Sequence, residues 1–218
     1  MISMKKFLVL LFWAIIQQLP AQQDMPKKFF WGIISGIEQH RLSIQSIPSK
    51  VSTPESPAAG AERTGTAGAV IGTFGRWQLT RDLAIQSELL CSYARNRVRF
   101  IPENIREKYR FLDVEVPLHF VVTNTRKTLP LRASFLLGGR VGWNFASNPT
   151  DKLSLFSGRT AADVGLGAEI RFNGIRIQPE VVYSYGLNNL HDYLNTAYDP
   201  GISSVVRDRI TLRVLVWR

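Results

Sequence analysis

Acidic and basic residues recur at every second position within otherwise apolar segments of the sequence. This spacing would place the charges along one face of a β-strand. If several such faces lined a closed and narrow interior, opposite charges would pair and plug it. We expect the paired set to contain Glu88, Asp113, Glu115, Arg132, Arg140, Asp163, Glu169, Arg171, Arg176, Glu180, Arg209 and Arg213.

The histidines raise a second kind of chemistry, since a His, a Ser and an acid together can hydrolyse or transfer acyl groups. His119 is expected inside, near the end of its strand. His191 stands beside Asp192, with Ser203 and Ser204 further along the chain. No nucleophile motif accompanies either histidine, and no two ligand types recur at a metal-binding spacing. We therefore expect no catalytic residue, no metal and no cofactor.

The clearest structural element is a hairpin with arms at 163–172 and 175–186. Apolar residues take the even positions of the first arm and the odd positions of the second. Between the arms, Asn173-Gly174 supplies the two positive φ angles of a type I′ turn. Each arm has the roughly 9–11 residues that cross a bilayer as a tilted strand.

The size of the side chains indicates which face of these strands is inside. A soluble, lipocalin-like barrel would have its apolar face inside and would need no glycines on its polar face. Here the polar face carries Gly165, Gly167 and Gly186, and elsewhere Gly138 and Gly142. A crowded lumen needs such small residues. We therefore place the charges inside and the bulky apolar residues outside, toward lipid.

Eight strands with this alternation are expected, at 29–39, 65–77, 83–97, 109–122, 131–145, 163–172, 175–186 and 204–217. Long connections at 40–64, 98–108, 146–158 and 187–203 alternate with short turns. Bacterial outer-membrane barrels have this order of long outer loops and short periplasmic turns. The predicted fold is all-β, an eight-stranded antiparallel up-and-down transmembrane barrel. An open pore or proton path along the charges is the alternative to a plugged lumen, but eight strands leave little room for one.

Aromatic residues of the outward face fall into two groups, and two aromatic belts are typical of membrane proteins. The group at the expected periplasmic ends is Phe29, Trp31, Trp77, Phe120 and Phe172. The group at the outer ends is Tyr93, Trp143, Phe145, Tyr183 and Tyr185.

Two positions depart from the regular pattern. Pro117 lies within a predicted strand, and it would remove one hydrogen bond from the ladder, so we expect a local irregularity there. Trp217 is the penultimate residue and has the inward parity, whereas outer-membrane barrels usually end in an aromatic residue.

The N-terminus indicates export. Residues 1–21 combine two lysines, an apolar stretch and a small-residue cleavage site, which predicts a signal peptide. The mature barrel domain would then span residues 22–218, and the expected location is the bacterial outer membrane. The net charge of +10 does not indicate nucleic-acid binding, because the basic residues share their faces with acids and lack an aromatic platform.

The expected partners are therefore outer-membrane lipid and lipopolysaccharide. Arg95, Arg97 and Arg99 stand at the expected outer rim, at the depth of lipid A phosphates, and arginine binds phosphate well. We interpret these three as candidate phosphate contacts. The alternative is an ordinary solvated loop.

Short motifs in a characteristic order give the chain a resemblance to the PorT family of outer-membrane barrels. They are FWGIISG at 30–36, LDVEVPL at 112–118, LLGG at 136–139, DVGLG at 163–167, QPE at 178–180, GLNNL at 186–190 and ISS at 202–204. The resemblance implies a non-enzymatic part in type IX protein secretion and gliding, with other secretion-machinery proteins as partners. It carries over no catalytic residue. A general structural or adhesive surface barrel and a lipid A-modifying enzyme remain the alternatives.

Overall fold

The chain forms nine strands in the computed structural model, which describes residues 29–46, 60–64, 67–101, 105–124, 131–145, 157–190 and 202–218. The predicted signal peptide, His191 and Asp192 lie outside these ranges. The strands are β1 (Phe29–Ser46), β2 (Gly60–Thr64), β3 (Ala67–Gln78), β4 (Leu83–Ile101), β5 (Ile105–Thr123), β6 (Leu131–Asn144), β7 (Gly158–Phe172), β8 (Ile175–Gly186) and β9 (Ile202–Trp217).

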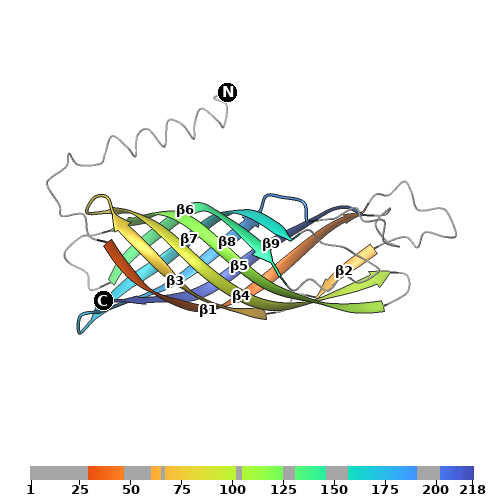
Figure 1. The fold of residues 1–218 in the computed structure, drawn as a ribbon, viewed down its shortest axis with the longest axis horizontal. Coiled ribbons are helices and arrows are strands. Elements are labelled where there is room, and N and C mark those ends of the chain that lie inside the picture. The colour runs from red at the N-terminus through yellow and green to blue at the C-terminus, as the bar shows by residue number, and fades with distance from the viewer. Residues whose placement is uncertain are drawn as a thin grey trace, which may run out of the picture.

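The strands close into a single antiparallel barrel (Figure 1). The sheet runs β4-β3-β1-β9-β8-β7-β6-β5, and the pairing of β5 with β4 completes the ring. The short β2 pairs with the part of β4 that extends beyond β3, so β2 and β3 occupy one place in the ring. The predicted eight-stranded barrel is therefore confirmed. No helix in the described ranges is long and apolar enough to cross a membrane.

The predicted hairpin between β7 and β8 is confirmed together with its turn. Asn173 has a φ of 47° and Gly174 a φ of 81°, as a type I′ turn requires. The two strands begin to pair at Phe172 and Ile175, directly beside the turn.

The outer ends of several strands extend further than the sequence indicated. The predicted loop at 98–108 is wrong, since β4 and β5 continue pairing up to Phe100 and Ile105. The predicted loop at 40–64 is also too long, because β1 runs to Ser46 and β2 lies within it. A strand that continues into water can be polar on both faces, so it loses the alternation by which the strands were found.

Prolines interrupt the barrel wall at two places. The β4–β5 ladder breaks between the pair Ser87 and Leu118 and the pair Leu90 and Glu115. This gap lies beside Pro117, so the predicted irregularity is confirmed. A second interruption, which we did not predict, lies beside Pro179 in the β7–β8 ladder.

The two faces of the wall have the predicted orientation. All ten residues of the two predicted aromatic belts are on the outside, with exposed fractions between 39% and 71%. The interior instead holds buried charged and polar side chains and a small apolar cluster near the end where β9 finishes. The outer surface therefore suits lipid, while the interior must satisfy its charges internally.

Candidate functional site

The interior of the barrel is the most distinctive site of the molecule. Among the described residues it buries seven carboxylates, six arginines and two histidines. Charges removed from water in this way are stable only when paired and hydrogen-bonded. Ion pairs and hydrogen bonds across the lumen provide these partners.

The widest contacts join β5 to β9, which lie opposite each other in the ring of eight strands. Arg207 of β9 donates to Asp113 of β5 over 2.6 Å. Arg209 of β9 forms an ion pair with Glu115 of β5 and a second with Glu38 of β1, the latter at 3.0 Å. The two pairs between β9 and β5 cross the full width of the lumen.

Glu115 is the central residue of these contacts, which form the outer layer of the network. Its Oε2 accepts from Arg140 and its Oε1 from Arg159, both at 2.9 Å. Arg140 in turn contacts Asp163 of β7 through Nε, at 2.8–2.9 Å. One carboxylate on β5 thus joins arginines from β6, β7 and β9.

His119 connects this layer to the next. Its Nε2 lies 2.8 Å from Asp163 and its Nδ1 lies 3.1 Å from Glu88. Carboxylates only accept hydrogen bonds, so both contacts are satisfied when each ring nitrogen carries a proton. Neither nitrogen is then available to activate a serine, which removes the main structural basis for catalysis at His119.

The inner layer is organised around Arg213 of β9. It donates to Glu88 at 2.6 and 2.8 Å and to Glu180 through Nε at 2.8 Å. Gln178 bonds Glu180 at 2.7 Å and accepts from Arg76 at 3.0 Å. The ion-pair network is therefore continuous from Arg159 near the outer end to Arg76 near the inner end.

An apolar cluster lies beneath the network. Trp217, only 4% exposed, packs edge-on against Phe74 at 5.6 Å between ring centroids. The guanidinium carbon of Arg76 lies 4.9 Å from the centroid of the Trp217 ring. The inward parity of the penultimate residue is thus explained, because Trp217 covers the inner end of the charge network.

Glycines make room for the network. A Cβ at Gly142 would stand 2.7 Å from the Cγ of Glu115. A Cβ at Gly138 would meet both the carbonyl oxygen of Leu118 and the ring of His119. Large charged side chains on one strand therefore require glycine on the next.

The structure places most of the predicted charged set in this network. Eight of the twelve are buried and joined by these contacts, namely Glu88, Asp113, Glu115, Arg140, Asp163, Glu180, Arg209 and Arg213. The remaining four, Arg132, Glu169, Arg171 and Arg176, gather at the inner mouth of the barrel, where β6, β7 and β8 end.

One of these four reaches into solvent. The Arg171 side chain is 46% exposed, and Arg176 is 28% exposed, while both lie near Glu169 at 3.0 and 3.7 Å. Arg171 is the second residue before the turn, so its long side chain reaches past the end of the strand into solvent. Arg171 therefore pairs with Glu169 at the mouth of the barrel, with its side chain partly in solvent.

The sequence also left out five members of the network. Glu38, His40, Arg76, Arg159 and Arg207 are all buried. His40 stood in the predicted loop at 40–64, and Arg159 stood between the predicted loop at 146–158 and the predicted strand at 163–172. The period-two spacing would have found three of them, since His40 follows Glu38 by two, Arg207 precedes Arg209 by two and Arg159 precedes Asp163 by four.

The candidate phosphate contacts lie on the outer part of β4. Arg95 is exposed, donates to the Tyr93 hydroxyl at 2.8 Å and stacks over the same ring. Arg97 and Arg99 pair through their backbones with Lys108 and Arg106 of β5, and their side chains are outside the described part of the structure. Among the described residues, no group of His, Cys, Asp or Glu could hold a metal ion.

A closed barrel with aromatic belts outside and paired charges inside is a transmembrane barrel of the bacterial outer membrane. Residues 20–192 match the family model for the outer membrane protein beta-barrel domain, and the chain belongs to that family. Its location is accordingly the bacterial outer membrane.

A solved outer-membrane protein structure shares this fold. The crystal structure of the outer membrane protein OprG from Pseudomonas aeruginosa superposes with a TM-score of 0.55 at 10% identity, covering 88% of this chain and 96% of that chain. The outer membrane protein AlkL, solved by solid-state NMR in lipid bilayers, gives a TM-score of 0.43 at 10% identity and covers 92% and 94%. A comparison with curated protein sequences finds no match.

Proposed function

We propose that this outer-membrane barrel is non-enzymatic and non-conducting, and that it acts through its rims as an accessory of type IX protein secretion. The observation that carries the first part is the interior itself. Ion pairs from β5 to β9 cross the whole lumen, and further layers follow beneath them. A solute would have to separate several buried ion pairs in order to pass.

The outer rim supplies the surface for such a role. β4 and β5 each have 19 residues, whereas roughly 9–11 residues cross a bilayer. The paired strands consequently project at the outer end, where the ends of β4, β5 and β2 lie furthest out in Figure 1. A projecting paired hairpin is pre-ordered, which lowers the entropic cost of binding another protein.

The type IX assignment rests on the resemblance to the PorT family. Deleting the gene and measuring the release of cargo proteins that carry the C-terminal signal domain tests it. We expect cargo to accumulate inside the cell, and complementation by the full-length gene to restore release. Normal release would refute the secretion role.

The second candidate is a structural or adhesive surface barrel, and the same projecting hairpin favours it. A chain shortened within the outer ends of β4 and β5 separates the two. Loss of surface attachment with normal cargo release would support adhesion, whereas loss of release with normal attachment would support secretion. Arg171→Ala, which changes a half-exposed side chain at the opposite end, provides the control.

A further inference from the structure

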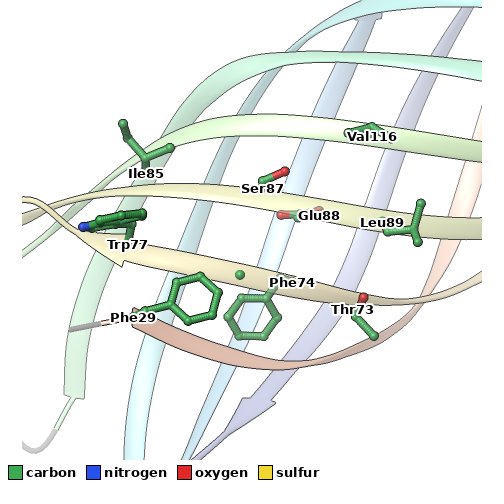
Figure 2. A pocket seen from close by; sticks show the side chains of 10 residues that line it. Phe29, Thr73, Phe74, Trp77, Ile85, Ser87, Glu88, Leu89 and Val116 are labelled. Atoms are coloured by element: carbon green, nitrogen blue, oxygen red, sulfur yellow. The ribbon is translucent and has the colours of Figure 1, made fainter. Parts of the chain in front are cut away.

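A groove of about 460 Å³ lies in the barrel wall where β1, β3, β4 and β5 meet (Figure 2). Most of its lining belongs to the outer, lipid-facing side. Phe29 and Trp77, from the inner aromatic belt, bound one part of it, and Val116 bounds another. The lining also includes two exposed hydroxyl residues, Thr73 and Ser87. Polar groups on a surface that faces hydrocarbon need an explanation.

The backbone at the groove adds a third polar group. The amide of Thr123 donates to the carbonyl of Asp82 at 2.8 Å. Asp82 and Thr123 are therefore a hydrogen-bonded pair of the β4–β5 ladder. Hydrogen-bonded pairs recur at every second position of an antiparallel ladder. By this count Glu88 stands opposite Pro117 in such a pair, and proline has no N–H to donate. The Glu88 carbonyl therefore loses its ladder donor at the groove.

The Glu88 side chain does not lie on the lipid-facing side of the groove. The Glu88 carboxylate points inward, where Arg213 and His119 hold it. Only the backbone of this residue can offer a hydrogen-bond acceptor on the wall. The exposed residues of its lining make the groove accessible from the outer surface of the barrel.

We propose that this groove binds a membrane amphiphile that carries an amide-linked acyl chain. An amide N–H would donate to the Glu88 carbonyl, and the amide oxygen would accept from the hydroxyl of Ser87 or Thr73. The acyl chain would lie against the apolar rim formed by Phe29, Trp77 and Val116. An ester-linked chain offers no donor, so it would leave the carbonyl unsatisfied.

The test compares two probes of the same length in which an N–H replaces an ester oxygen, N-methylpalmitamide and methyl palmitate. Their binding to the full-length barrel in detergent micelles is measured by native mass spectrometry. We expect the native protein to bind the amide about tenfold more tightly than the ester, the effect of one hydrogen bond in an apolar site. Equal affinity for the two probes would overturn the proposal.

Three variants locate the effect. Pro117→Ala supplies the missing N–H, so the preference for the amide should disappear. Pro179→Ala changes the other proline-linked interruption, in the β7–β8 ladder away from the groove, and should leave the preference intact. Ser87→Leu fills the groove and should weaken both probes. A preference for the amide that survives in Pro117→Ala would also overturn the proposal. So would unchanged binding of both probes by Ser87→Leu, and each result counts even if the other variant does not fold.

Discussion

Arg213 of β9 and Glu88 of β4, which are 125 residues apart in the chain, form a two-pronged ion pair inside the barrel. Both side chains are essentially inaccessible to solvent. The pair closes a very long loop of chain, and it also links His119 to Glu180 and so joins two layers of the network. Strands that are distant in sequence are therefore tied together across the lumen as well as along the wall.

Removing one partner of this pair should be costly. Glu88→Ala leaves the Arg213 guanidinium with Glu180 alone, so we expect a loss of about 3–5 kcal/mol in the free energy of unfolding. Denaturant unfolding in lipid bilayers measures it. Glu169→Ala is the matched control, because its partner Arg171 is half exposed, and we expect it to cost less than about 1 kcal/mol. Equal losses for the two variants would contradict the network's structural role.

The interior glycines give a sharper steric test. Gly138→Ala would push a methyl group into the Leu118 carbonyl and the His119 ring. At the adjacent Gly139 the nearest atom, the carbonyl oxygen of Ala161, would be 3.3 Å away. We expect Gly138→Ala to destabilise the barrel by about 1–3 kcal/mol and Gly139→Ala to be close to neutral. The reverse order in the same unfolding assay would show that the packing is misassigned.

The rim arginines should respond to lipid composition. If Arg95, Arg97 and Arg99 contact lipid A phosphates, the native barrel is more stable in bilayers that contain lipid A than in phosphatidylcholine. Changing all three to Glu should remove that increment, by about 1 kcal/mol for each arginine, without altering stability in phosphatidylcholine. If the triple variant is still more stable in bilayers that contain lipid A, the rim is an ordinary solvated one.

The faces of the strands could be predicted from the sequence because a period of two is a local property. The position of Trp143 outside and of Arg140 inside follows from parity alone, and the structure agrees. Even the inward position of Trp217 followed from its parity.

The partners of these side chains could not be predicted in the same way. Arg209 meets both Glu38 and Glu115, and which strands face each other depends on how the whole barrel closes. The outer ends of β4 and β5 were missed for a different reason. The predicted loop contains Arg99, Arg106 and Lys108, and such a density of charge is typical of a loop, although their backbones continue the ladder.

The account depends most on a lumen that is sealed by paired charges, and ion conductance tests this most directly. The purified barrel is inserted into planar lipid bilayers, with an open porin as the control for insertion and with proteolysis of the projecting hairpin to verify that the barrel is present. We expect no discrete conductance steps above the bilayer leak at any applied voltage. Reproducible single-channel openings from the native barrel would contradict the sealed interior.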